Sequence, residues 1–186
     1  MPQLLDKYEA DVVPAMMEQF GYKNARAVPR LEKIVVSAGV GRGSEEKDRL
    51  NQALEDLTQI TGQRAVATKA RKSIAGFNIR RGMPVGVRVT LRGARMYEFL
   101  LRLIALAIPR IRDFRGLSPR AFDGGGNYSF GIDEQGVFPE IDPDSIQVTQ
   151  GMNISLVTTA ATDEEGRELL RQLGMPFARE EEREEE

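Results

Sequence analysis

The sequence predicts an α+β protein: an antiparallel β-sheet with helices packed on one face and the other face free. Segments with strand and helix patterns interleave, but they lack the regular alternation of a doubly wound α/β protein. Residues 85–92 alternate apolar side chains with glycine, arginine and threonine, so one face of this strand is apolar and the other polar. The length of 186 residues suits one domain. We therefore expect a single domain over residues 1–178 and an acidic disordered tail over 179–186.

The first half of the chain predicts two helices around a strand. Apolar residues recur at helical spacing at Leu4, Leu5, Tyr8, Val12, Met16 and Phe20, and Pro14 predicts a kink or restart in this helix. Residues 31–37 read as a buried strand. A glycine turn at 39–43 leads to a helix capped by Ser44 and ended by Gly62. The inner stripe of that helix is Leu50, Ala53, Leu54, Leu57 and Ile60.

The second half predicts two further strands, two helices and an irregular stretch. A short strand at 64–68 precedes the alternating strand at 85–92, and an apolar helix at 96–108 is stopped by Pro109. Residues 116–136 are glycine-rich and read as irregular, and 153–160 read as a strand. Thr162 and Glu165 form a capping box that opens a last helix, which Gly174 and Pro176 end.

Composition argues against most enzyme classes. The chain has no Cys and no His, so it lacks thiol nucleophiles, thiolate zinc sites and the commonest general base. No run reaches the roughly 20 apolar residues of a membrane span. Acidic side chains at Asp6, Glu9 and Asp11 do not fit a signal peptide. We expect a cytoplasmic protein without catalysis or cofactor.

Charge is strongly segregated although the net charge is only −2. Residues 64–120 carry 14 basic and 2 acidic side chains, whereas residues 121–186 carry 4 basic and 16 acidic ones. A mid-chain block this basic is typical of a surface that binds nucleic acid or another polyanion. The alternative is solvated surface balanced by acids elsewhere.

The longest informative segment is the connection between the two paired strands, residues 69–84. Connections in compact domains usually span about 4–6 residues, and longer ones are often functional. This one contains five basic residues and no acid, around Phe77 and Asn78. Arginine matches phosphate geometry, and Phe77 could stack on a base or pack under the loop. A nucleic-acid contact is favoured over a basic loop without a partner.

Three other patterns favour structural roles. The glycines at 39, 41 and 43 follow a strand, but they lack the Gly-Lys-Ser/Thr ending of a P-loop and the spacing of a dinucleotide site. A tight turn, which could still hold an RNA phosphate, is the preferred interpretation. Residues 123–127 indicate a backbone with several unusual dihedral angles. Asp142 and Asp144 offer carboxylates without a further ligand pattern, so no metal site is predicted.

Long, ordered motifs carry a specific resemblance. They are residues 68–77 (TKARKSIAGF), 89–93 (VTLRG), 108–118 (IPRIRDFRGLS), 122–129 (FDGGGNYS), 134–135 (EQ) and 138–141 (FPEI). These motifs resemble the bacterial family of large-subunit ribosomal protein five, which binds 5S rRNA. The similarity extends from about residue 2 to residue 178.

The resemblance implies a structural, non-catalytic constituent of the ribosome. Its implied partners are 5S rRNA and 23S rRNA in the central protuberance, the elbow of the P-site tRNA, neighbouring large-subunit proteins and a small-subunit head protein at an intersubunit bridge. The candidates for 5S rRNA on the free sheet face are Ser37, Gln63, Arg64, Arg88, Thr90 and Arg92. The candidates for tRNA in the basic loop are Lys69, Arg71, Lys72, Asn78, Arg80 and Arg81.

Three features depart from that family. Ser37 stands where Asn is common, and Gly125 stands where Arg is common. The family usually ends near Phe177–Arg179, so the resemblance gives the acidic extension no role. Deleting residues 180–186 should leave affinity for 5S rRNA within about tenfold, since an acidic tail supplies no phosphate contact. A larger loss in a filter-binding titration would show that the tail takes part in binding.

Two other function classes remain for comparison. An enzyme that binds a nucleotide at residues 39–43 would show nucleotide affinity without RNA, and the sequence offers it no base. A module for anionic membranes would need one strongly basic amphipathic helix, whereas most basic residues here fall on a strand, a loop and an irregular segment.

Overall fold

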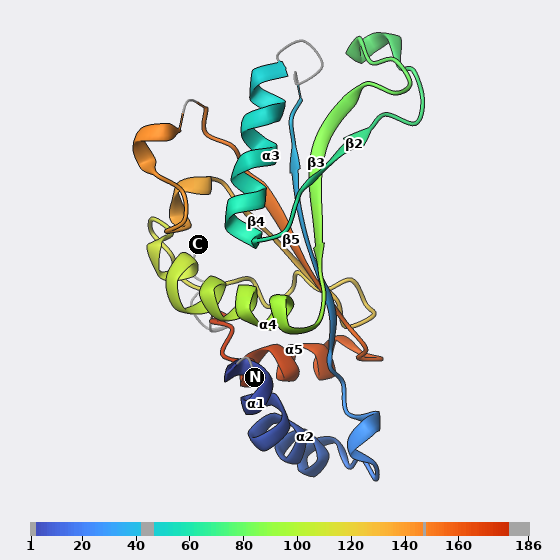
Figure 1. The fold of residues 1–186 in the computed structure, drawn as a ribbon. Coiled ribbons are helices and arrows are strands. Elements are labelled where there is room, and N and C mark those ends of the chain that lie inside the picture. The colour runs from blue at the N-terminus through green and yellow to red at the C-terminus, as the bar shows by residue number, and fades with distance from the viewer. Residues whose placement is uncertain (1–2, 42–46, 147, 179–186) are drawn as a thin grey trace, which may run out of the picture. The chain divides into compact units, whose positions relative to one another are not determined.

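The computed structural model describes residues 3–41, 47–146 and 148–178, and it confirms the α+β class. Five strands form one antiparallel sheet in the order β2-β3-β1-β5-β4 (Figure 1). The strands are β1 (Leu31–Gly39), β2 (Val66–Lys69), β3 (Pro84–Leu91), β4 (Tyr128–Ile132) and β5 (Met152–Thr158). The helices are α1 (Gln3–Lys7), α2 (Val13–Phe20), α3 (Lys47–Thr61), α4 (Gly93–Arg102) and α5 (Asp163–Leu173).

The chain folds into two compact units, neither of which is continuous in sequence. The first unit combines Met1–Ile34, Arg92–Phe130 and Ser155–Glu186, and the second combines Val35–Leu91 and Gly131–Ile154. Strands β1, β4 and β5 contribute residues to both units. Each unit has its own buried apolar side chains, so each is described separately.

The first unit is mainly helical. Its N-terminal helical segment runs from α1 through a π-helical turn (Tyr8–Val12) into α2, and Pro14 lies in the first turn of α2. The predicted kink takes the form of a π-helical turn that precedes Pro14. Proline is tolerated in the first turn of a helix, because its missing N–H group is not needed there. The buried side chains of this segment include Leu4, Tyr8, Val12 and Met16, as the apolar spacing predicts.

The helix predicted at 96–108 is longer at both ends. Helix α4 begins at Gly93, and it is followed directly by a π-helical turn (Leu103–Ala107) and a 3-10 turn (Ile108–Arg110) that contains Pro109. The prediction that Pro109 stops the helix is wrong. Proline is tolerated there because it sits in the first turn of the 3-10 segment.

Helix α5 forms as predicted. The Thr162 hydroxyl accepts a hydrogen bond from the Glu165 N–H at 3.4 Å, and the Glu165 carboxylate accepts one from the Ala161 N–H at 2.9 Å. Gly174 ends the helix with φ +104°. The capping box and the C-terminal glycine are both confirmed.

Strand β4 corrects the prediction that residues 116–136 are irregular. Tyr128 and Ile132 are buried on one face of this strand, while Ser129 and Gly131 are exposed. The strand is short and flanked by glycine-rich sequence, so its pairing beside β5 at the sheet edge decides its conformation. In the sequence, Tyr128, Phe130 and Ile132 alternate with small residues, and this pattern could have predicted the strand.

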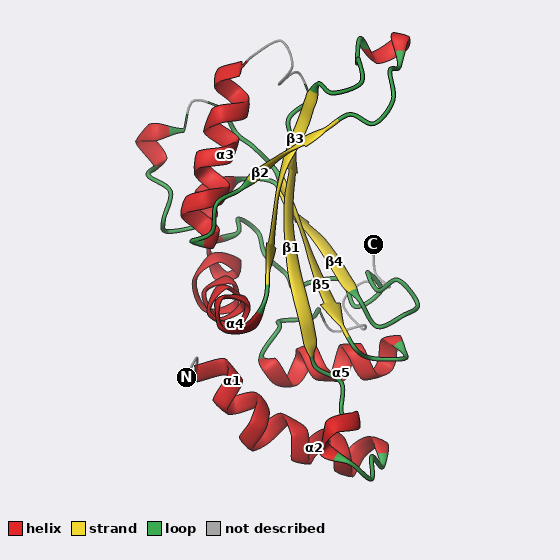
Figure 2. Cartoon of the chain, turned by 45° about the vertical axis from the view of Figure 1, so that its right-hand side comes forward, coloured by secondary structure: helices red, strands yellow, loops and turns green. Residues whose placement is uncertain are grey.

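In the second unit, α3 covers one face of β2 and β3 (Figure 2). Ala53, Leu57 and Ile60 of α3 are buried, and so are Val87, Val89 and Leu91 of β3. Gly62, with φ +65°, ends the helix as predicted. The predicted cap Ser44 lies outside the described residues. No described helix of this unit covers the opposite face of β2 and β3 (Figure 2).

Candidate RNA-binding surface

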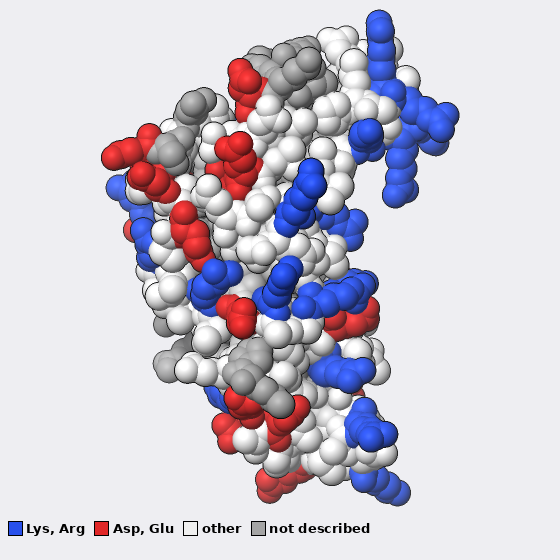
Figure 3. Space-filling model, in the orientation of Figure 1, with Lys and Arg blue, Asp and Glu red and all other residues white. Residues whose placement is uncertain are grey.

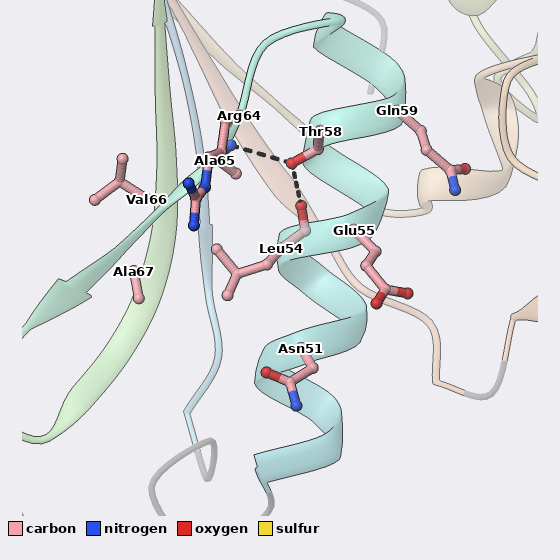
Figure 4. Close-up of a pocket in the computed structure, with 9 residues that line it drawn as sticks. All are labelled: Asn51, Leu54, Glu55, Thr58, Gln59, Arg64, Ala65, Val66 and Ala67. Atoms are coloured by element: carbon pink, nitrogen blue, oxygen red, sulfur yellow. Dashed lines mark hydrogen bonds between the residues drawn. The ribbon is translucent and has the colours of Figure 1, made fainter.

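The uncovered face of β1, β2 and β3 in the second unit is polar. On β3, Arg88 is exposed and Thr90 is half-buried, and they alternate with the buried valines that face α3. Val66 of β2 pairs with Arg88 across the antiparallel ladder, so the two side chains share this face. Val66 is 65% exposed and points away from α3 (Figure 4). We call the group Ser37, Val66, Thr68, Arg88 and Thr90 the polar face.

Gly86 keeps the middle of the polar face free of a side chain. A Cβ atom at this position would lie 2.7 Å from the carbonyl oxygen of Ala38 and 3.2 Å from the Thr68 hydroxyl. The β1 backbone is therefore too close for any larger residue. On β1, Ser37 is half-buried between the buried residues Val36 and Ala38, so its hydroxyl lies on the polar face.

Gln63 and Arg64 lie at the edge of the sheet, between α3 and β2. The Gln63 side-chain amide donates a hydrogen bond of 3.0 Å to the carbonyl oxygen of Thr90. This bond fixes the side chain beside β3 and leaves its amide oxygen as an acceptor. Arg64 is exposed and lines an open groove between α3 and β2 (Figure 4). The Thr58 hydroxyl lines this groove and joins α3 to the residue before β2. It donates a hydrogen bond to the Leu54 carbonyl oxygen at 2.6 Å and accepts one from the Ala65 N–H at 3.1 Å.

Arg92 lies just past the end of β3, in the first unit, whereas the sequence predicted it on the strand. It is the residue before α4, and its guanidinium lies 3.3 Å from the Glu32 carboxylate. Hydrogen bonding from Arg92 lowers the pKa of Glu32 from its ordinary value, with a further contribution from Lys33. Both partners are exposed, so the ion pair adds little stability and Arg92 stays accessible to a polyanion.

The basic loop 69–84 forms an ordered hairpin. Backbone hydrogen bonds join the Ala70 N–H to the Met83 carbonyl at 2.8 Å and the Gly82 N–H to the Ala70 carbonyl at 2.9 Å. Nearer the tip, Ile74 and Ile79 bond each other in both directions, at 2.8 and 3.1 Å. We call residues 69–84 the basic hairpin; it lies beyond the paired part of β2 and β3 (Figure 1).

All six predicted tRNA-binding side chains of the basic hairpin are exposed: Lys69, Arg71, Lys72, Asn78, Arg80 and Arg81. Lysine and arginine side chains gather over the hairpin in the view of Figure 3. With no acid in the segment, these cations present an uninterrupted positive potential to solvent.

Two glycine-rich motifs have structural roles in the part described. The Asp163 carboxylate accepts hydrogen bonds from the N–H groups of Gly124 and Gly126, at 3.1 and 2.9 Å, so this loop already holds an anionic group. Gly124 and Gly126 have φ values of +86° and +74°, which confirms the predicted unusual backbone. Gly39 ends β1, and its carbonyl oxygen accepts a bond from the Gln150 side chain. Gly43 lies outside the described residues.

Asp142 and Asp144, the carboxylates that were considered as metal ligands, take part in a local turn. Asp142 accepts a hydrogen bond of 3.1 Å from the Asp144 N–H and so caps a 3-10 turn. Over the described ranges, no group of three or more acidic side chains is placed to hold a metal ion. Within the same ranges, none of the helices has the length and apolar character needed to cross a bilayer.

Thr68, Val66 and Gly86 were absent from the predicted sites. Thr68 and Val66 come to the polar face through the register of β2 with β3, which pairs Val66 with Arg88 and Thr68 with Gly86. Residues 66–69 read Val-Ala-Thr-Lys, which is too short and lacks the apolar–polar alternation needed to fix a register.

Comparison with known proteins decides the family. The sequence profile of ribosomal protein L5 matches residues 24–80, and that of the ribosomal L5P family C-terminus matches residues 84–177. The chain belongs to the ribosomal protein L5 family. The first L5 profile ends and the second begins within the basic hairpin, with residues 81–83 between them, so all residues of the polar face lie in the matched part.

Curated relatives in the L5 family match nearly the whole chain. The large ribosomal subunit protein uL5 of Carboxydothermus hydrogenoformans is 58% identical over 96% of this chain and 100% of its own length. The uL5 proteins of Rubrobacter xylanophilus and Thermotoga maritima are 59% and 56% identical, over 95% of this chain and 98% and 96% of their own lengths. This is a family of structural proteins, which agrees with the prediction that the chain is not an enzyme.

Proposed function

We propose that this protein binds 5S rRNA through its polar face and Arg92, and links it to 23S rRNA in the central protuberance. Membership of the L5 family makes it a structural constituent of the large ribosomal subunit, in the cytoplasmic ribosome. The observation that carries the proposal is the exposed Arg88 beside Thr90 and Ser37 on a sheet face that no described helix of its unit covers. Its mechanism is assembly and positioning, without a chemical step.

Each side chain of the polar face suits a different part of RNA. The Arg88 and Arg92 guanidiniums can bind phosphate oxygens through paired N–H groups. The hydroxyls of Ser37 and Thr90 can exchange hydrogen bonds with ribose hydroxyls or base edges. The free amide oxygen of Gln63 accepts, and Arg64 extends the positive charge to the sheet edge.

The basic hairpin supports a second contact, with the elbow of the P-site tRNA. The hairpin is ordered by its own backbone bonds and carries only positive charge, so it can reach a second RNA while the polar face holds the first. The resemblance also supports contacts with neighbouring large-subunit proteins and with a small-subunit head protein at an intersubunit bridge.

Footprinting on 5S rRNA tests the polar-face assignment. The purified chain should protect one contiguous region of 5S rRNA from hydroxyl-radical cleavage. Substituting Arg88→Ala should restore cleavage at some of the protected nucleotides and leave the others protected. Protection that is unchanged by Arg88→Ala would place the RNA elsewhere on the protein.

Reversing Arg80 and Arg81 to glutamate should separate the two proposed RNA contacts. Both residues lie on the basic hairpin, away from the paired region of β2 and β3. Affinity for 5S rRNA should change by less than about threefold, whereas P-site tRNA should bind assembled ribosomes about ten- to a hundredfold more weakly, as expected for two lost phosphate contacts. Filter binding measures both quantities. A large loss of 5S binding would show that the basic surface is divided differently.

A further inference from the structure

One aromatic side chain at the tip of the basic hairpin is almost fully exposed. Phe77 has 74% of its surface accessible, the largest value among the exposed large apolar residues in the part of the chain described. Ile74, at the base of the same tip, is 47% exposed. Phenylalanine is among the residues most often buried, and Phe77 and Ile74 together expose apolar surface at one hairpin tip, as contact surfaces do.

The backbone holds Phe77 in place. Residues 75–77 form a 3-10 turn, closed by a hydrogen bond of 3.1 Å from the Asn78 N–H to the Ala75 carbonyl. Asn78 adopts a left-handed conformation with φ +53°, and the mutual bonds of Ile74 and Ile79 close the loop behind it. The ring is thus carried on a short closed turn, which lowers the entropy lost when it binds.

The surroundings of Phe77 favour RNA over other partners. Ala75, Gly76 and Asn78 are small, so no bulky neighbour along the chain blocks access to the faces of the ring. The exposed cations Lys72, Arg80 and Arg81 lie on the same hairpin without any acid. An aromatic ring among cations is the arrangement that proteins use to stack on bases while they hold the phosphate backbone.

We propose that Phe77 stacks on an RNA base that is unpaired or lies at the open end of a helical stack, and so positions the tRNA elbow on the basic hairpin. The proposal rests on the proposed tRNA contact and adds the group that recognises it. Phosphate contacts alone would hold any RNA helix. Stacking requires an accessible base face, so Phe77 would select the folded elbow over a closed duplex.

Ribosomes that carry Phe77 variants provide the first test. P-site tRNA should bind about five- to a hundredfold more weakly with Phe77→Ala, the range measured for loss of one stacked base. Phe77→Trp should restore the affinity and Phe77→Leu should not, because leucine keeps an apolar surface but cannot stack. Equal affinity for Phe77→Ala and the unchanged protein, or full rescue by leucine, would overturn the proposal. If Arg80→Glu with Arg81→Glu also had no effect, the tRNA contact itself would fail.

The absence of tryptophan from the chain allows a direct second test. In the full-length Phe77→Trp variant, the only tryptophan reports on the tip of the hairpin. Titration with tRNA should quench its fluorescence, whereas a closed RNA duplex should not. Val148→Trp, at an exposed position of the same unit outside the polar face and the basic hairpin, is the matched control and should respond less to tRNA. Equal quenching by the closed duplex would overturn the stacking proposal. It would also be overturned if tRNA caused no quenching and phosphatidylglycerol vesicles shifted the emission to the blue, since that would indicate a membrane contact.

Discussion

Replacing Arg88 and Arg92 by glutamate should weaken binding of 5S rRNA by about a hundredfold or more. A hydrogen bond to a charged group contributes about 1.5–3 kcal/mol, and two such contacts are lost. The reversal also places negative charge against phosphate, which adds repulsion. Both side chains are exposed, so the free energy of unfolding should change by less than about 1 kcal/mol. Filter binding and thermal denaturation measure the two quantities.

Two controls isolate the RNA contact. Lys23→Glu with Arg26→Glu reverses the same amount of charge at two exposed positions of the first unit that are not candidate residues. Glu32→Gln removes the ion-pair partner of Arg92 and leaves its positive charge. Both variants should keep 5S affinity within about threefold. A folded Arg88→Glu, Arg92→Glu protein with unchanged affinity, or an equal loss in the Lys23 and Arg26 variant, would remove the polar face from the RNA interface.

Gly126→Ala and Gly166→Ala should each strongly destabilise the fold. A Cβ atom at Gly166 would lie 2.6 Å from the Gly126 carbonyl oxygen, and one at Gly126 would lie 2.6 Å from the Ala160 Cβ. Alanine in place of Gly166 gains about 1 kcal/mol of helix propensity in α5. That gain is outweighed because the obstructing atoms at Gly126 are backbone and cannot rotate away.

The expected loss is largest for Gly126→Ala. Overpacking costs about 1–3 kcal/mol, and the positive φ of +74° adds about 1–2 kcal/mol for a residue with a Cβ. A loss of 3 kcal/mol lowers the melting temperature of a chain of this size by about 6–12 °C. Gly125→Ala is the matched control, because its Cβ would meet only ordinary contacts at 3.5 and 3.8 Å. Equal stability of the three variants in thermal denaturation would contradict this close approach.

The sequence predicts elements best where the pattern is long and local. Val87, Val89 and Leu91 alternate with polar residues over enough length to identify β3 and its apolar face. Thr162 and Glu165 lie only three positions apart, so the capping box that they form is readable without the fold. Strand β4 was missed because five residues beside a glycine-rich loop acquire strand structure from pairing at the sheet edge.

The candidate site was predictable in its residue types and less so in its geometry. The basic hairpin stands out from charge alone. By contrast, the place of Arg92 depends on where β3 ends and α4 begins, and its pairing with Glu32 joins residues 60 positions apart. The exposure of Phe77 depends on the closed turn at residues 74–79, which no local pattern specifies.

Binding of the purified protein to 5S rRNA across a salt series tests the central claim most directly. A structured RNA of the same size serves as the competitor. Specific recognition predicts a strong preference for 5S rRNA that persists as salt rises, because hydrogen bonds from Ser37, Gln63 and Thr90 are less sensitive to salt than phosphate contacts are. Equal affinity for the two RNAs, falling together as salt rises, would contradict specific binding of 5S rRNA by this surface.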